Sequence, residues 1–263
     1  MWAEVWGYTP GIMSRQTVRF WAFFALLLWG THALGYLLHE YAHSFTAWAL
    51  GFKANPFALI YGRPTVQNFI FLSDVDENVD YGAVFSAGKG YVASLIALNG
   101  MLIGNGIPYF LSIGVYSFAR KRGRRMLGLF AFLYCLMNLG NFIDYVPVRT
   151  FTTHADMANL ERGLRLSPWW IVSVLGLPIA IAFWHFFMRM LPDARDFVSP
   201  GVRVGQAILT VLSAFTIFGY YGTSGMSGYG EVSRRISVFS ICIAFPAVLI
   251  ACWPRRGKPM AGA

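Results

Sequence analysis

Apolar residues fill six stretches of the chain, and shorter segments with glycine, proline or charged residues separate them. A helix needs about 20 apolar residues to cross the hydrocarbon core of a bilayer, and each stretch is about that long or longer. The predicted spans are 18–50, 91–118, 126–146, 168–190, 204–221 and 236–253. We therefore expect an all-α polytopic membrane protein with about six transmembrane helices.

The first predicted helix is longer than one crossing requires. At 1.5 Å per residue it would measure about 48 Å, against a core of about 30 Å, so its last turns should tilt or emerge into an interface or cavity. The following segment, 51–90, has Pro56, Gly62, Pro64 and Asn68 between short aromatic and β-branched stretches. This pattern is typical of strands and turns. We expect a short strand-rich interfacial segment whose edge could receive an extended substrate.

Composition agrees with a membrane protein and argues against nucleic acid as a partner. Hydrophobic residues make up 56% of the chain and charged residues 13%, whereas soluble domains carry about 25% charged residues. The net charge of +9 comes from short basic runs between the apolar stretches, which the positive-inside rule explains. The partner is then the lipid bilayer, and residues 1–263 form a single membrane-embedded domain.

The distribution of Lys and Arg predicts the orientation of the spans. The larger share of these 21 residues falls on the side that holds Arg15, Arg19, the loop 120–125 and the tail 255–258. By the positive-inside rule both termini are cytoplasmic, and the segments 51–90 and 147–167 face outward. The predicted location is the plasma membrane of a prokaryote.

The first predicted helix carries the motif His39-Glu40-Tyr41-Ala42-His43. Two histidines four residues apart project from one helix face and can bind one metal ion, with the intervening glutamate beside the metal-bound water. Zinc is the metal expected, with Glu40 as the catalytic base and acid. Each ionisable group costs ~2.5 kcal/mol or more at the centre of a membrane. A shared ligand explains why His39, Glu40 and His43 cluster there better than the alternative that the two histidines only pack in the helix bundle.

A catalytic zinc site requires a third protein ligand. The segment that closes the third span and enters the next outward loop offers Asp144, His154 and Asp156. In the expected topology this segment and the end of the first helix lie on the same side of the membrane, so the two can meet.

The order of these features resembles the site-2 protease family of intramembrane zinc metalloproteases. The residues that match are His39, Glu40, His43, Asn141, Pro147 and Asp156, within a catalytic core at about 18–165. The additional helices at about 168–253 match nothing specific. The resemblance implies hydrolysis of peptide bonds in membrane-anchored protein substrates, with Asp156 as the third zinc ligand.

The resemblance also bears on two asparagines and leaves alternatives open. It implies that Asn138 and Asn141 bind an unwound substrate backbone, although both could instead join helices by polar contacts. Met157 follows Asp156 where the family usually has glycine, so Asp144 and His154 remain alternative ligands. Glu161 is a further one, because another class of membrane zinc proteases uses glutamate.

A non-proteolytic binding, regulatory or metal-binding module of the same fold is the alternative function, and the oligomeric state is not indicated.

Overall fold

A computed structural model describes residues 15–226 and 228–254 of the chain. Within these residues, six helical stretches are long and apolar enough to span a membrane, which confirms the predicted number. They begin and end close to the predicted positions, and the fourth continues further than expected. The spans are Val18–Ala49, Gly90–Lys121, Arg125–Val148, Pro168–Val198, Arg203–Met226 and Glu231–Ala251. The protein is an all-α integral membrane protein.

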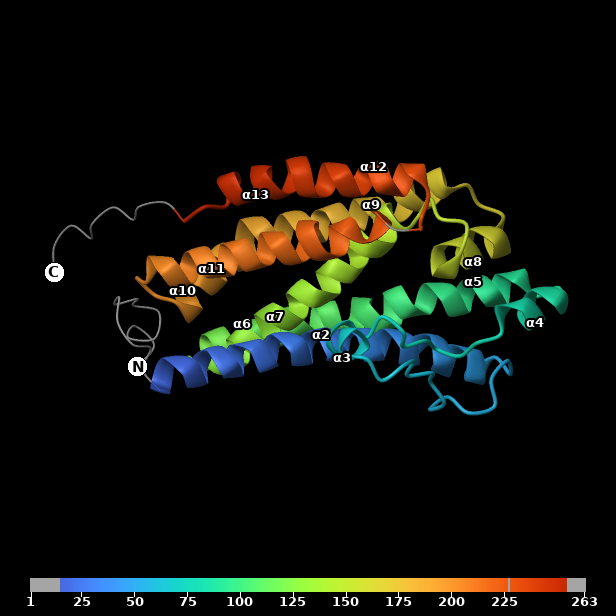
Figure 1. The fold of residues 1–263 in the computed structure, drawn as a ribbon, viewed down its shortest axis with the longest axis horizontal. Helices are drawn as coiled ribbons and strands as arrows, with labels where there is room; N and C mark the ends of the chain where they lie inside the picture. Colours follow the sequence, from blue (N-terminus) through green and yellow to red (C-terminus); the bar gives the residue numbers. More distant parts are fainter. Residues whose placement is uncertain (1–14, 227, 255–263) are drawn as a thin grey trace.

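The third span lies at the centre of the bundle (Figure 1). Its helix α7 (Arg125–Ile143) is apolar on all sides, as expected of a helix enclosed by neighbours, and it buries a series of large side chains completely. These are Leu129, Phe132, Leu133, Leu136 and Leu139. The helices that surround it include α2 (Arg15–Ala49), α6 (Ile107–Lys121), α9 (Pro168–His185) and α10 (Leu191–Val198). In the fifth span, α11 (Arg203–Ala214) continues into η4 (Phe215–Tyr220), which contacts α7. The last span, with α12 (Glu231–Phe239) and α13 (Phe245–Ala251), is the least buried.

Several spans contain π-helical segments that the apolar pattern did not predict. In the second span, η1 (Gly100–Gly106) separates α5 (Gly90–Asn99) from α6, and in the third span η2 (Asp144–Val148) follows α7. Three more are η3 (Phe186–Met190), η4 (Phe215–Tyr220) and η6 (Ser240–Ala244), and the 3-10 helix η5 (Tyr221–Met226) ends the fifth span. Such segments are frequent at functional sites. Here η1 and η2 both contribute residues to the site described below.

The prediction of a strand-rich segment at 51–90, all of which the structure describes, is wrong. Residues 51–90 form the short helices α3 (Val66–Phe71) and α4 (Tyr81–Ser86), and the pairing of Ile60 with Asp76 is only an isolated bridge. The reason is local. The Thr65 side chain accepts a hydrogen bond from the backbone of Asn68, and the Asn68 amide bonds three backbone groups of the surrounding loop. Side chains therefore satisfy the backbone, and no strand edge is presented.

This segment covers the second half of the overlong first helix. The Trp29 indole donates to the carbonyl of Phe69 at 3.1 Å, and the Ser44 hydroxyl donates to the carbonyl of Pro56 at 2.7 Å. Polar groups near the end of α2 thus meet protein instead of lipid, as membrane helices require.

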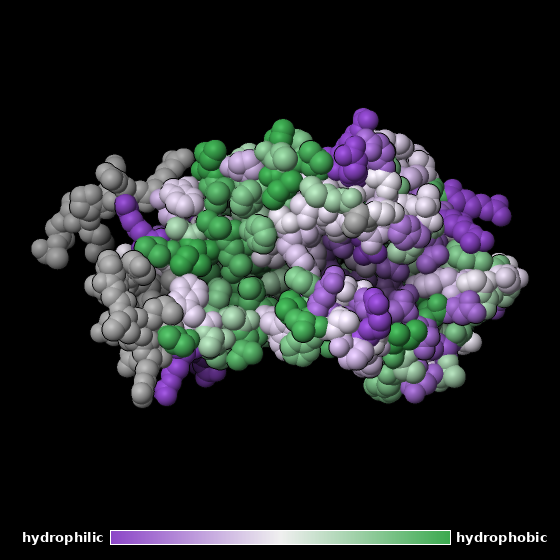
Figure 2. Space-filling view, viewed as in Figure 1, coloured by the Kyte–Doolittle hydropathy of each residue, from purple (hydrophilic) through white to green (hydrophobic). Residues whose placement is uncertain are grey.

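The surface is divided along the long axis of the molecule. In Figure 2 apolar residues form a broad band toward the end where α2 begins and α13 ends, and hydrophilic residues gather at the opposite end. That polar end carries α4 and α8 (Ala155–Leu164) in Figure 1. The predicted orientation of the termini stays a prediction, and the basic residues Arg255, Arg256 and Lys258 lie outside the described residues.

The helix α8 docks against α5 through a pair of glycines. A Cβ atom on Gly163 would overlap the carbonyl of Gly90 and the hydroxyl of Ser94, and that hydroxyl donates to the carbonyl of Leu160 at 3.0 Å. Close approach of the two backbones therefore requires glycine at this position.

The substitution Gly163→Ala should therefore destabilise the protein. Overpacking of this kind costs about 1–3 kcal/mol, and thermal unfolding in detergent would measure it. Gly114→Ala is the matched control, because nothing lies within 4 Å of a Cβ atom there. Equal unfolding temperatures for the two variants would contradict the proposed role of this contact.

Candidate metal centre

His39 and His43 lie one turn apart on α2, and their side chains turn toward each other. The two Nε2 atoms are 2.9 Å apart. His39 is 3% exposed and His43 is fully buried. The four-residue spacing places both rings on one face of the helix, so the predicted pairing of the two histidines is present.

Outer hydrogen bonds fix which nitrogen of each ring carries the proton. His39 Nδ1 lies 2.7 Å from the side-chain oxygen of Asn105, and His43 Nδ1 lies 2.7 Å from the carbonyl of Ile96. Both oxygens only accept, so each Nδ1 must be the donor. The lone pair of each ring is then on Nε2 and faces the space between the two histidines. Metal-binding histidines are generally held in this way.

Asp156, in the first turn of α8, completes the group. Its Oδ2 atom lies 3.7 Å from His39 Nε2 and 3.5 Å from His43 Nε2. Asp156 thus brings a carboxyl oxygen close to both rings, and three ligand atoms from two segments of the chain converge on one point.

The distances suit a small cation with tetrahedral ligands. Zinc bonds of 2.0–2.1 Å place neighbouring ligand atoms about 3.3 Å apart, and the three observed separations lie on either side of that value. Two imidazole lone pairs and a carboxylate would otherwise repel one another. His39, His43 and Asp156 are thus a buried group that could bind a metal ion.

Tyr145, in η2, adds a hydroxyl to this group. Its oxygen lies 2.7 Å from His39 Nε2 and 3.0 Å from Asp156 Oδ2. The single phenolic proton faces two acceptors and can satisfy only one. A cation bound by His39 and Asp156 would remove this conflict and leave the hydroxyl free to donate elsewhere.

Asp144 is engaged away from the histidines. Its Oδ1 accepts a hydrogen bond from the hydroxyl of Ser224, and its Oδ2 lies 3.4 Å from the guanidinium of Arg149. Arg149 also lies over the rings of Tyr145 and Tyr229. The carboxylate of Asp144 is thus already paired with a cation, and it is absent from the group that gathers around His39 and His43.

The other two candidate ligands also face elsewhere. The ring of His154 stacks on that of Tyr229, with the ring centroids 5.0 Å apart, and its Nδ1 lies 3.1 Å from the hydroxyl of Thr152. Glu161 lies further along α8, and burial raises its pKa to about 7. Neither belongs to the group formed with His39 and His43.

Glu40 is buried beside the two histidines. The residue is 6% exposed, and its carboxyl forms no hydrogen bond or ion pair with residues 15–226 or 228–254. Neither carboxyl oxygen of Glu40 is among the fully enclosed side-chain atoms that lack a partner. With no hydrogen bond to the described residues, the carboxyl therefore borders a small accessible space in which it can contact a water or a ligand.

Asn138 and Asn141 both bond within the helix bundle. Asn138 is fully buried, donates to the carbonyl of Tyr134 and accepts from the amide of Asn105. Asn141 donates to the carbonyl of Met137 and, at 3.4 Å, to the hydroxyl of Tyr221. These contacts match the alternative of polar contacts between helices. A substrate-binding role for the two asparagines stays a prediction.

Two residues of the site, Asn105 and Tyr145, did not follow from the motif. Asn105 lies in η1, next to a close approach of that segment to α2. A Cβ atom on Gly100 would collide with the rings of both histidines, and one on Gly104 would collide with the backbone of His39. The spacing of these glycines in a membrane span is a known signal of close helix contact. Tyr145 carried no such signal.

Comparisons of the chain with protein-family models, with curated proteins and with solved structures found no match. The geometry of the side chains therefore carries the functional argument.

Replacing Asp156 should empty the metal site. Asp156→Ala removes one of three ligands, so metal affinity should fall by more than the roughly 10–100-fold that loss of an outer-shell partner causes. Metal content of the purified protein measures this. Asp144→Ala and His154→Ala are the matched controls and should retain the metal. Loss in either control with retention in Asp156→Ala would reassign the third ligand.

Replacing Asn105 should weaken the site without removing a ligand. Asn105→Ala leaves His39 free to rotate and to change tautomer, and a loss of roughly 10–100-fold in metal affinity is expected. Titration against a competing chelator measures it. Asn99→Ala is the control, because Asn99 also joins this span to α2, by a hydrogen bond to Thr46. An equal loss in both variants would indicate general loosening of the helix pair.

Proposed function

We propose that the protein is an intramembrane zinc metalloprotease that resembles the site-2 protease family and hydrolyses membrane-anchored proteins. The observation that carries the proposal is the convergence of His39, His43 and Asp156 on one point, with Glu40 between the two histidines on the same helix. Metal storage or structural binding would need the ligands alone. An additional free carboxyl next to them is what hydrolysis requires.

Zinc is proposed as the metal because of the donor set. Two imidazoles and one carboxylate are a ligand set of catalytic zinc sites, in which a fourth position stays open. When bound, zinc would supply a water of lowered pKa and positive charge for the developing oxyanion. The tautomers set by Asn105 and Ile96 present both Nε2 atoms in the form that binds a metal.

Glu40 would move the proton during the reaction. Its carboxylate accepts a proton from the attacking water and then donates it to the nitrogen of the leaving amine. The position between the two ligands, one residue after His39 and three before His43, keeps the carboxyl beside the site.

Tyr145 is the residue best placed to assist at the carbonyl oxygen. Its hydroxyl lies beside His39 and Asp156, and once both are bound to a cation its proton can point to the substrate. A donor already in place where negative charge develops is an effective source of catalysis.

The substrate class follows from the location of the site. His39 and His43 lie in a membrane span and Asp156 lies between two spans, which supports a target that is anchored in the bilayer. A transmembrane helix satisfies its amides internally and must unwind before cleavage. Substrates should therefore carry helix-destabilising residues. We place the protein in the plasma membrane of a prokaryote with cytoplasmic termini, in line with the charge distribution.

Glu40→Gln separates catalysis from metal binding. The amide keeps the size of the side chain but cannot accept the proton, so metal should remain while cleavage of single-span substrates falls by ~10²-fold or more. Zinc content and cleavage in detergent are measured together. Glu161→Gln is the matched control, because it also neutralises a partly buried carboxyl, and it should keep both metal and activity.

The outcomes are distinct. Wild-type protein that purifies with iron or without metal would refute the zinc assignment. Zinc-loaded wild type that cleaves no substrate, with Glu40→Gln indistinguishable from it, would favour the non-proteolytic module.

A further inference from the structure

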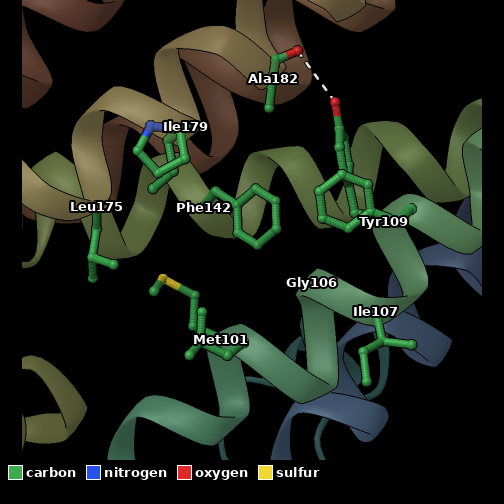
Figure 3. A pocket seen from close by; sticks show the side chains of 11 residues that line it. Met101, Gly106, Ile107, Tyr109, Phe142, Leu175, Ile179 and Ala182 are labelled. Atoms are coloured by element: carbon green, nitrogen blue, oxygen red, sulfur yellow. Dashed lines mark hydrogen bonds between the residues drawn. The ribbon is translucent and has the colours of Figure 1, made fainter.

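An apolar cavity of about 250 Å³ lies between the second, third and fourth spans. Figure 3 shows residues of these three spans arranged around it. Its floor is formed by the buried side chains of Met101, Tyr109, Phe142 and Ile179. At its rim, Ile107 and Phe110 are 53% and 72% exposed. The cavity therefore reaches buried side chains and opens on the outer surface of the bundle.

The lining contains no polar group available to a ligand. Tyr109 has the only polar side chain among the lining residues, and its hydroxyl donates to the carbonyl of Ala182 at 3.2 Å, the dashed line in Figure 3. A polar ligand would lose its hydrogen bonds to water and gain none here. Only an apolar occupant is compatible with this lining.

We propose that this cavity binds one acyl chain of a bilayer lipid. All its walls belong to membrane spans, so hydrocarbon chains are the material in contact with its opening. Side chains that line an empty space lose their dispersion contacts, and a flexible chain restores them. The volume limits the occupant to part of one chain.

The bound chain supports the metal site through η1. Met101 lines the cavity, and its neighbours in η1 contact the opposite side: Gly100 lies against His39 and His43, and Asn105 bonds His39 Nδ1. The acyl chain and α2 thus contact η1 from opposite sides. This second step rests on the proposed metal centre, whereas lipid binding itself does not.

Photolabelling tests the lipid site. The full-length protein is reconstituted in phosphatidylcholine bilayers that contain a lipid with a diazirine along one acyl chain, irradiated and mapped by peptide mass spectrometry. Labels should be enriched several-fold in 101–110 and 175–182 over the exposed apolar segment 243–250. Ala182→Phe, which fills the cavity, should lower labelling of 101–110 several-fold. The control Val174→Phe, on the same helix at a residue 63% exposed and outside the cavity lining, should not.

Uniform labelling of all apolar segments, or equal labelling in Ala182→Phe and wild type, would overturn the lipid site. Ile107→Trp at the exposed rim replaces Ala182→Phe if that variant does not fold.

Zinc affinity tests the support of η1. Removal of lipid by detergent should weaken zinc binding several-fold in wild type and in Val174→Phe, and less in Ala182→Phe, whose ring replaces the chain. Equal sensitivity in all three would overturn the link to the metal site. Failure of every variant to bind zinc would refute the link and the metal centre, while the labelling result would still decide the lipid site.

Discussion

The structure depends on the convergence of three acceptor atoms that are largely shielded from solvent. His39 Nε2, His43 Nε2 and Asp156 Oδ2 all present lone pairs to one small space. In a membrane span such groups are costly unless they are paired, and a shared cation removes both the repulsion and the lost hydration. Much of the surrounding architecture keeps this convergence in place. The outer bonds from Asn105 and Ile96 set the tautomers, and the docking of α8 on α5 brings the carboxylate to the rings.

The two π-helical segments nearest the site explain how membrane helices can deliver side chains so closely. In η1 the glycines allow the backbone to approach the histidine rings, and the same segment supplies Asn105. In η2 the backbone departs from the regular α-helix of α7. As a result, the Asp144 side chain points toward Arg149 and the Tyr145 side chain points toward His39. The departures from regular α-helix near the site thus occur where side chains must be brought to specific positions. Such π-helical segments are frequent at functional sites in helical proteins.

The six spans and the pairing of His39 with His43 could be predicted from the sequence, because hydropathy and four-residue spacing report directly on lipid exposure and helix faces. The segment 51–90 could not. Its aromatic and β-branched residues favour strands, but the side chains of Thr65 and Asn68 satisfy the local backbone and favour a short helix. The position of Asn105 depended on a π-helical segment, which no periodicity of apolar residues reveals. Tyr145 reaches the site only through the path of η2 after α7.

The distinction between the acidic residues is electrostatic, and sequence spacing could not resolve it. Asp144 lies next to the site in sequence, yet Arg149 and Ser224 occupy its two oxygens. Asp156, twelve residues later, faces the Nε2 atoms of His39 and His43 and has no arginine or lysine partner among the described residues. Glu40 differs from both, since it lies on the same helix as the two histidines and its carboxyl forms no hydrogen bond or ion pair with the described residues. One carboxylate is thus neutralised by the protein, one is placed to share a metal, and one is left able to exchange a proton. This division of roles is what the proposed hydrolysis requires.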